Sequence, residues 1–441
     1  MKKIKSAYFA FLLCAYAIST VSAQEMKYDV LLKGGHVIDP VNNINKVMDV
    51  AVKDSKIALV DTNIPESDSE KVFDVSGYYV TPGLIDIHVH CFHTSQTSNF
   101  PIIADHHHFP SGVTTVVDAG TSGARNFEDF KKIIDSSRIR ILAFLNIAAP
   151  GMGSAEIEPS EFDIKLAVET SQKFPEIIVG FKTAHYYSLS SKRPYDEAHP
   201  PWASADSILA AGRLADLPIM FDFHPRPPSD GYPARSFREI MLEKLRPGDI
   251  YTHCFSGVFP TILKDGNVNP DVISARRRGV NFDIGHGGAS LSFKTAIPAI
   301  KQGFYPSSIS TDLHNGNVNG PVHNMVNVMS KFLCIGMPLN DVIRCTTVNP
   351  AHEINHPELG NLSAGSTADI AVLETVRGNF SYYDCSYLGS GNAKINGDKK
   401  LQCVMTLRNG NVVWDPLGLN VPLLEDIPEG DKYWARPPQD W

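Results

Sequence analysis

The middle of the chain alternates short apolar runs with longer segments of mixed polarity. Four of the longer segments, residues 127–137, 161–173, 203–215 and 237–245, have the pattern of helices. Eight strands with intervening helices, over residues 83 to about 351, match a (β/α)8 TIM-type barrel in number and size. An open, doubly wound sheet is the alternative, but no glycine-rich nucleotide fingerprint follows the first strand. The eight predicted strands are GLIDIHVH, VTTVVDAG, IRILAFLNIA, IIVGFKTAH, LPIMFDFHP, DIYTHCFSG, VNFDIGHG and SSISTDLH.

Both ends of the chain have a different pattern, in which apolar and polar residues alternate one by one. This pattern occurs in YDVLLKGGHVIDP and VMDVAVKDSKIALV near the start, and in TADIAVLE and CVMTLRNGNVVWDP near the end. Such segments predict short antiparallel strands, and Asn409-Gly410 predicts a hairpin turn. We therefore expect one small β-domain built from the N- and C-terminal segments, with the barrel inserted between them.

The N-terminus has the three parts of a secretory signal peptide. A basic start is followed by an apolar stretch from Tyr8 to Ile18 and by small residues ending at Ala23. A membrane anchor is the alternative, but the apolar stretch is shorter than the about 20 residues that span a bilayer. We predict cleavage after Ala23 and a periplasmic or secreted protein with no membrane attachment. The predicted limits are 1–23 for the signal peptide, 24–80 and 353–441 for the two parts of the β-domain with the C-terminal tail, and 81–352 for the barrel.

Composition narrows the functional classes. The net charge of −8 and the lack of a basic run argue against nucleic-acid binding, while 16 histidines prompt a search for a metal site. Cys91 and Cys254 each follow a histidine, and we expect them to be small buried residues rather than ligands. Export makes disulfides possible, and Cys385 and Cys403 could bridge a hairpin.

Polar residues gather at the C-terminal ends of the predicted strands, where barrel enzymes have their active sites. Residues i and i+2 of a strand point to the same side, so the first two histidines of the set can reach one point. Neutral imidazole is a favoured ligand of zinc and similar ions, and histidines at two further strand ends strengthen the prediction of a metal site. In strand order the set is His88, His90, Lys182, His224, His253 and Asp312.

Lys182 and Asp312 each allow two interpretations. A buried ammonium is costly and unsuited to a place beside a cation. Lys182 therefore either pairs with Asp312 or reaches solvent, or its amine has reacted with carbon dioxide to give an anionic carbamate that bridges two metals. Asp312 is either the N-cap of the following segment or a metal ligand that accepts a proton from bound water. Asp86, two residues before His88, shares its side of the strand and could orient a ligand.

Several motifs resemble those of the amidohydrolase superfamily. VTPGLIDIHVH is similar to its signature, and the strand-end residues follow the order of the binuclear branch with a carboxylated lysine, which contains dihydroorotases, hydantoinases and D-aminoacylases. GVTTVVDAG, VNPA and GNLSAGSTADIAV are also similar, so the resemblance covers nearly the whole chain after the signal. DIYTHCFSG, GHGGASLSF and STDLH look most like the amidohydrolase/deacetylase metallohydrolases.

The resemblance implies two divalent metal ions, with Zn²⁺ as the default expectation. His88, His90 and Asp312 would hold the more buried ion, His224 and His253 the second, and carboxylated Lys182 would bridge them. A metal-bridging hydroxide would attack the substrate, with Asp312 as the catalytic proton carrier. The mononuclear deaminases of the superfamily lack the strand-four lysine, so Lys182 counts against that branch.

The resemblance implies an exported hydrolase of an amide or ester bond in a small molecule, a deacetylase of N- or O-acetylated carboxylic acids. Cyclic amidases, of the dihydroorotase or hydantoinase type, and D-aminoacylases or dipeptidases are the alternatives. The sequence leaves open the metal identity, the substrate's acyl group and stereochemistry, and whether the chain forms a homo-oligomer.

Other polar residues near strand ends are candidates for substrate contacts. Arg226 could clamp a carboxylate or form a surface salt bridge, and His185 and Tyr186 could line the pocket. His286 could be a pocket wall or a hydrogen-bond partner behind the ligands. The histidine run 106–108 is interpreted as the end of a helix on the barrel rim, away from the metals.

Overall fold

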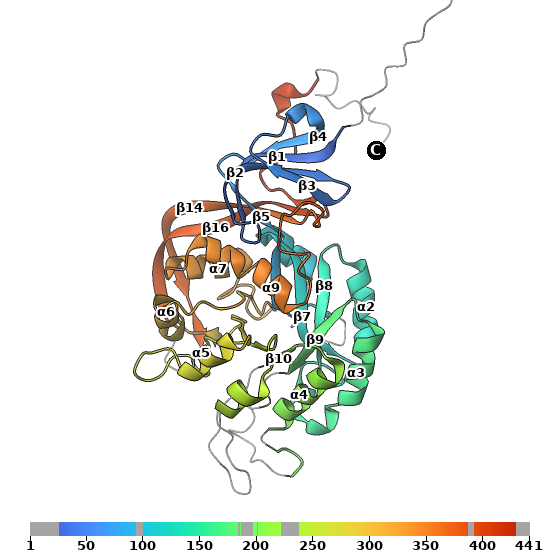
Figure 1. Cartoon of the computed structure of the whole chain (residues 1–441), viewed down its shortest axis with the longest axis vertical. Helices are drawn as coiled ribbons and strands as arrows, with labels where there is room; N and C mark the ends of the chain where they lie inside the picture. The colour runs from blue at the N-terminus through green and yellow to red at the C-terminus, as the bar shows by residue number, and fades with distance from the viewer. Residues whose placement is uncertain are drawn as a thin grey trace, which may run out of the picture.

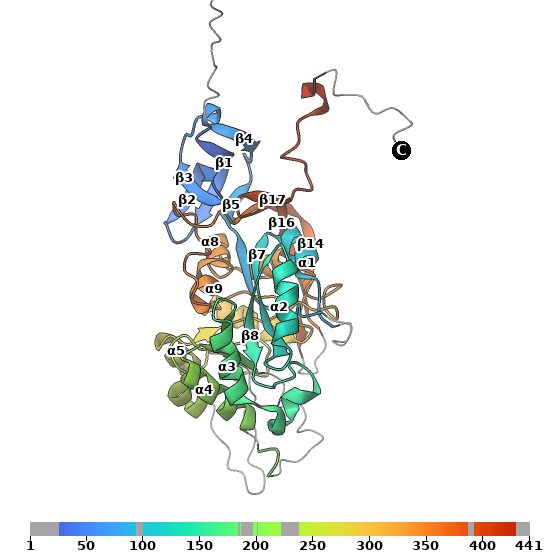
Figure 2. The same ribbon diagram turned by 90° about the vertical axis from the view of Figure 1, so that its right-hand side faces the viewer.

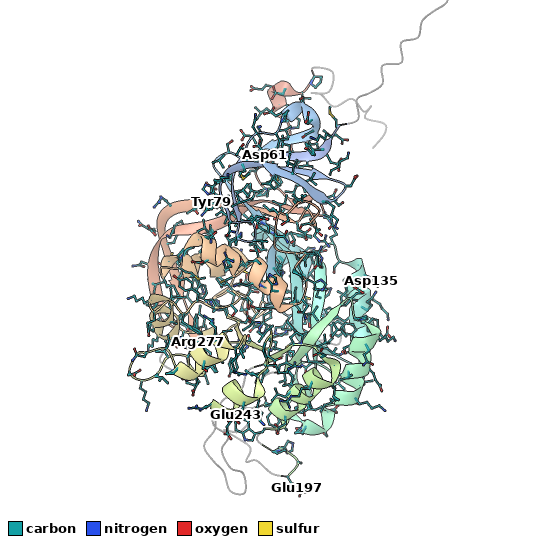
Figure 3. The ribbon with its side chains drawn as sticks, in the orientation of Figure 1. Asp61, Tyr79, Asp135, Glu197, Glu243 and Arg277 are labelled. Atoms are coloured by element: carbon teal, nitrogen blue, oxygen red, sulfur yellow. The ribbon has the colours of Figure 1, made fainter. Side chains whose placement is uncertain are left out.

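The computed structural model describes residues 26–93, 100–183, 186, 197–200, 202–221, 238–386 and 392–428. Figure 1 shows a small sheet at one end of an elongated molecule and a larger body of strands and helices at the other. In Figure 3, Asp135 lies at the outer edge of the larger body.

The larger body is built on a curved sheet of parallel strands. Each strand pairs with the next one along the chain, as expected for a barrel. An eighth extended segment, residues 308–313, bridges Asp283 through Ser308 and Val89 through Leu313, and so links the last strand of the sheet to the first. The predicted (β/α)8 barrel is confirmed, and the open sheet is excluded. The strands are β6 (Leu84–Val89), β7 (Val113–Gly123), β8 (Arg140–Asn146), β9 (Ile178–Thr183), β10 (Ile219–Phe221), β11 (Ile250–Tyr251) and β12 (Asn281–Phe282).

Helices follow most of these strands and cover the outside of the barrel. Phe127 and Phe130, one helical turn apart, are buried and anchor the first long helix. The predicted helix from 161 begins later, at Ile164, because the Asp163 carboxylate accepts a hydrogen bond from Leu166 N at 2.9 Å and caps it there. The helices are α1 (Ala104–His108), α2 (Phe127–Ser136), α3 (Ile164–Lys173), α4 (Ala203–Ala215), α5 (Pro270–Arg277), α6 (Phe293–Lys301), α7 (Met325–Cys334), α8 (Leu339–Arg344) and α9 (Val348–Glu353). Shorter turns are η1 (Glu66–Asp68), η2 (Phe109–Ser111), η3 (Ser154–Ile157), η4 (Pro159–Glu161), the π-helical η6 (Glu239–Lys244) and η7 (Leu424–Asp426).

The smaller sheet takes strands from both ends of the chain. Its order is β17-β16-β14-β5-β1-β2-β3, with β4 paired to β1. The antiparallel pairing of β5 with β14 joins the two ends, at the junction seen in Figure 2. Asn409 and Gly410 both have positive φ, at 51° and 74°, as a tight hairpin turn requires. The strands are β1 (Tyr28–Asp39), β2 (Ile44–Lys53), β3 (Lys56–Asp61), β4 (Ser69–Asp74), β5 (Tyr79–Pro82), β14 (Ile370–Tyr383), β16 (Lys394–Arg408) and β17 (Asn411–Trp414).

The hairpin of β14 and β16 extends beyond this sheet and reaches the barrel. In Figure 1 it curves past α7 toward α6. Leu401 N donates to Ser330 Oγ on α7 at 2.9 Å. Beyond the hairpin, β15 (Cys385–Ser386) pairs with β13 (Ser290–Leu291), in the loop that follows the seventh barrel strand. The C-terminal segment therefore contacts the loops at the mouth of the barrel.

The structure tests the predictions about the cysteines but not the prediction of a signal peptide. Cys91 and Cys254 are buried, as expected, but Cys385 and Cys403 are both free thiols, so the suggested disulfide is wrong. The signal peptide lies outside the described residues, and its cleavage stays a prediction. Within the described part of the chain, no helix combines the length and apolar character needed to cross a membrane.

Candidate metal centre

Three of the predicted ligands converge at the mouth of the barrel. Atoms of His88, His90 and Asp312 that could bind a metal all lie within 4.8 Å of one another, and the three residues are buried. Asp312 Oδ1 lies 2.9 Å from His90 Nε2 and 3.7 Å from His88 Nε2. The closing of the barrel sets this geometry, because Asp312 N donates to His88 O at 2.6 Å and His90 N donates to Leu313 O at 3.1 Å.

Both histidine rings are oriented by contacts of their Nδ1 atoms, on the side away from Asp312. His88 Nδ1 lies 3.0 Å from Thr252 Oγ1 and 3.3 Å from Asp283 Oδ2, and His90 Nδ1 lies 2.9 Å from Thr121 Oγ1. Burial raises the pKa of Asp283 to about 6, so at neutral pH it is mainly a carboxylate that accepts the His88 proton. These contacts direct both Nε2 atoms toward Asp312, as metal-binding histidines require.

Asp86 has a different role from the one suggested by its spacing. Its carboxylate accepts hydrogen bonds from Thr311 N at 3.0 Å and Thr311 Oγ1 at 2.6 Å, and so joins β6 to the segment that carries Asp312. Asp86 also accepts from His88 N at 3.4 Å, so it contacts the backbone of a proposed ligand, whereas the side chain that contacts the His88 ring is Asp283. The run 106–108 ends a helix as predicted; His106 is exposed, whereas His108 is buried with its Nε2 3.4 Å from Asp86 Oδ2.

His253 follows β11 and stands beside the cluster. Its ring centroid is 5.1 Å from that of His88, and its Nδ1 donates to Gly285 O at 2.7 Å, which leaves the lone pair on Nε2. His253 and Asp312 both have left-handed backbones, with φ of 56° and 50°. This conformation costs a non-glycine residue about 1–2 kcal/mol, and such strain is concentrated at functional sites.

Lys182 is the penultimate residue of β9 and is only 2% exposed. Among the described residues, no carboxylate lies within ion-pair distance of its Nζ. Lys182 therefore neither reaches solvent nor pairs with Asp312, which removes the two ordinary interpretations. A Cβ on Gly120 would lie 2.9 Å from Lys182 Cγ, so the glycine leaves room for the side chain.

The charges of the cluster suit metal binding. Burial is the main cause that holds the pKa of His88 well below its usual value, so its imidazole is neutral and can donate a lone pair. Burial alone would raise the pKa of Asp312, but the neighbouring His88 and His90 outweigh it and hold that pKa well below its usual value. The site therefore offers the neutral imidazole of His88 and the carboxylate of Asp312.

The predicted substrate residues are only partly covered by the structure. His185, Arg226 and the predicted ligand His224 lie outside the described residues, and their roles stay predictions. Tyr186 is buried, and its hydroxyl donates to Pro200 O at 2.7 Å. His286 is buried behind the ligands, where its Nε2 lies 2.7 Å from Lys331 Nζ.

Three features of the site were missed by sequence reasoning. Asp283 and Lys331 each interrupt an apolar stretch, which was a usable signal. Phe100 and His314 stack at a centroid distance of 4.0 Å, and the Phe100 centroid is 5.6 Å from that of His90, so they form an aromatic border to the cluster. Phe100 and His314 come from segments far apart in the sequence, so no local sequence pattern predicts their contact.

Comparisons with known proteins agree with this geometry. The model of the amidohydrolase family matches residues 289–413. A deacetylase of Agrobacterium fabrum is 34% identical over 332 residues, which are 73% of this chain and 77% of the relative. A deacetylase of Enterococcus faecalis is 30% identical over 353 residues, which are 79% of this chain and 90% of the relative.

Solved structures give the same result. The crystal structure of an adenine deaminase superposes with a TM-score of 0.75 at 26% identity, covering 88% of this chain and 100% of that one. A dihydroorotase superposes with a TM-score of 0.72 at 28% identity, covering 88% and 97%. The chain therefore belongs to the amidohydrolase family of metal-dependent hydrolases.

Proposed function

We propose that this hydrolase removes acetyl groups from small N- or O-acetylated carboxylic acids, and that it does so after export from the cytoplasm. The observation that carries the proposal is the buried cluster of His88, His90 and Asp312, whose ligand atoms lie within 4.8 Å of one another. The choice of deacetylation is supported by relatives at 30–34% identity that are named deacetylases.

The chain's own residues fit two divalent metal ions, with zinc as the first expectation. His88, His90 and Asp312 would hold one ion, since each imidazole has its Nδ1 engaged and its Nε2 turned toward the carboxylate. His253 would hold the second ion through Nε2, because its Nδ1 proton is bound to Gly285 O. His224 would complete this set, a role that rests on the sequence alone.

Carboxylation of Lys182 would provide a ligand shared by the two proposed metal ions. An uncompensated buried charge costs several kcal/mol, and no described carboxylate balances this ammonium. Reaction of the neutral amine with carbon dioxide forms a nitrogen–carbon bond, releases one proton and leaves an anionic carbamate. The two oxygens of the carbamate are suitable ligands for zinc and similar ions.

The protein groups then divide the work of the reaction. When bound, the metals supply an activated water near neutral pH and polarise the scissile carbonyl. Asp312 accepts the proton of the attacking water and delivers it to the leaving amine or alkoxide. Its Oδ1 lies 2.9 Å from His90 Nε2, and its Oδ2 packs against Gly287, where a Cβ would lie only 2.3 Å away. A fixed carboxylate is a better proton carrier, because it does not have to be reoriented during the reaction.

A cyclic amidase is the second candidate function. It is favoured by the superposition with a dihydroorotase at a TM-score of 0.72. The proposed metal ligands suit either reaction, so only substrates can separate the two. D-Aminoacylase, dipeptidase and adenine deaminase activities belong in the same screen, the last because of the superposition with an adenine deaminase.

The test is a substrate screen on the chain from Gln24 onward, loaded with zinc in the presence of bicarbonate. The panel contains N-acetyl amino acids, O-acetyl hydroxy acids, dihydroorotate, hydantoins, dipeptides and adenine. We expect acetate release that chelation abolishes, two metal equivalents per chain, and loss of turnover in Asp312→Asn. Turnover of cyclic ureides alone would replace the deacetylase by the cyclic amidase, and a chain that binds no metal and turns over nothing would refute both.

Export and assembly are tested separately. Fractionation of the native host should place the chain outside the cytoplasm with an N-terminus at Gln24, and retention of Met1 in the cytoplasm would refute export. We also propose a homo-oligomer, to be measured by sedimentation. Its support is the C-terminal segment, which stands apart from the sheet in Figure 2 and exposes apolar side chains. Those side chains are Leu417, Val421, Leu423 and Leu424, which are 52–70% exposed.

A further inference from the structure

A glycine-rich turn, residues 285–287, lies between two of the proposed ligands. Gly285 O accepts the Nδ1 proton of His253 at 2.7 Å. On the other side, a Cβ on Gly287 would lie 2.3 Å from Asp312 Oδ2. The two glycines have φ of 45° and 52°, a conformation that gives the turn its close approach to both ligands. Gly287 N also donates to Thr311 O at 3.0 Å, directly before Asp312, so a shift of this turn would disturb both ligands.

The side chain between the two glycines points away from the ligands. His286 is fully buried, its Nδ1 lies 2.9 Å from Gly287 O, and its Nε2 lies 2.7 Å from Lys331 Nζ. A carbonyl oxygen can only accept, so Nδ1 carries the proton and Nε2 accepts from the lysine. His286 thus fastens the turn to α7 rather than lining the pocket.

Lys331 joins this turn to two other segments. Its Nζ, on a side chain that is 1% exposed, also donates to Pro321 O at 2.8 Å and to Tyr383 O at 2.7 Å. Pro321 follows the eighth barrel strand, and Tyr383 ends β14 of the C-terminal hairpin. Three acceptors, each from a different part of the fold, therefore surround Nζ, and the protonated amine has a donor for each of them.

The hairpin also contacts Gly288, the residue directly after the 285–287 turn. Cys385 Sγ donates to Gly288 O, and β15 pairs with β13 directly after the turn. The turn is thus fixed at His286 through Lys331 and at Gly288 through Cys385. Among the proposed ligands that the structure describes, none contacts Lys331 or Cys385 directly, so both act through the turn.

We propose that Lys331 is a positioning residue of the metal centre, which acts through His286 on the turn that holds His253 and Asp312. This inference rests on the proposed metal centre. Loss of a residue that orients metal ligands typically lowers metal affinity or activity about 10–100-fold. The cost of burying an amine in an apolar helix is offset by the three hydrogen bonds that it makes.

The experiment measures the zinc dissociation constant by chelator competition, together with kcat and KM. Lys331→Met should weaken zinc binding about 10–100-fold and lower kcat with little change in KM, because substrate contacts remain. His286→Gln keeps an acceptor for Lys331 and should stay closer to wild type than His286→Leu. The double variant Lys331→Met/His286→Leu should be no worse than the poorer single variant, because both act on one contact.

Ser330→Ala is the matched control on the same helix. Ser330 Oγ binds Val326 O and Leu401 N, so its loss disturbs the packing of α7 on the hairpin without touching the turn. This variant should lose stability but keep the zinc affinity of the wild type.

The outcomes separate the inference from the proposed function. A wild-type chain that binds no zinc refutes the metal centre itself. If the wild type binds zinc and both Lys331→Met and His286→Leu bind it equally tightly, the positioning role is wrong. It is also wrong if Ser330→Ala weakens zinc binding as much as Lys331→Met. If Lys331→Met does not fold, the comparison of His286→Gln with His286→Leu decides, and equal affinity in that pair overturns the inference.

Discussion

Replacing Lys182 by methionine should have opposite effects on the metal-free and the metal-loaded protein. Lys182 is 2% exposed, and no described carboxylate lies within ion-pair distance of its amine. Methionine is apolar and of similar length. In the metal-free protein the variant removes the cost of burying an uncompensated charge, on the order of several kcal/mol per ion, so it should be more stable than the wild type. In the metal-loaded protein, the variant lacks the amine from which the bridging carbamate forms.

The expected loss of stability in the metal-loaded protein follows from the linkage between metal binding and folding. A ligand at 100 times its dissociation constant stabilises the folded state by about 2.7 kcal/mol, and most of this should disappear in Lys182→Met. Urea unfolding followed by circular dichroism, once with chelator and once with zinc and bicarbonate, measures both effects. Metal analysis of the same samples should show fewer than two equivalents per chain.

Two results would refute this reasoning. One is a Lys182→Met variant that keeps two metal equivalents and wild-type turnover, because no lysine-derived bridge would then exist. The other is a metal-free variant less stable than the metal-free wild type, because Lys182 would then make favourable contacts beyond those seen among the described residues. Lys182→Glu is the matched control, since it supplies a carboxylate and should retain more metal than Lys182→Met.

Three further predictions concern other parts of the molecule. Gly287→Ala should abolish most turnover in a folded protein, because its Cβ would lie 2.3 Å from Asp312 Oδ2 and its φ is 52°; wild-type kcat would contradict this. Burial lowers the pKa of Lys331 from 10.5 to about 7, so between these pH values the unfolded chain binds more protons than the folded one. The free energy of unfolding should therefore rise with pH across this window, by at most about 1.4 kcal/mol per pH unit, and the rise should be missing in urea titrations of Lys331→Met. Asp49→Ala should cost about 2–4 kcal/mol in thermal or urea unfolding but leave kcat unchanged, because the buried carboxylate binds Gly34 N and Ile64 N, both at 2.8 Å, far from the barrel mouth.

The sequence predicted features that depend on local period, and missed those that depend on register between distant strands. His88 and His90 were placed on one side of β6 because side chains alternate along a strand. The carboxylate that contacts the His88 ring could not be predicted in this way. It belongs to Asp283, which follows β12 and reaches His88 only through the arrangement of neighbouring strands. The start of α3 was missed for a local reason, the cap formed by Asp163.

The hairpin that connects the β-domain with the barrel was also predicted only as far as its local period. Alternating polarity predicted strands near 367–374 and 403–414, but it gave no sign that β14 and β16 extend toward the barrel mouth. The extension matters because three groups of the barrel depend on it for their partners. Asp384 Oδ2 accepts from Phe293 N at 2.6 Å at the start of α6, Tyr383 O accepts from Lys331, and Gly288 O accepts from Cys385.

These contacts give the C-terminal strands a role beyond completing a second sheet. A barrel that folds before the hairpin arrives has the start of α6 uncapped and Lys331 without one of its three acceptors. The 285–287 turn would then be held from one side only, while the backbones of His253 and Asp312 still carry the strain of positive φ. Strained residues persist only where the surrounding structure fixes them. The C-terminal hairpin thus helps to position the proposed metal centre, because Gly288 and Cys385, 97 positions apart in the chain, are joined by a hydrogen bond.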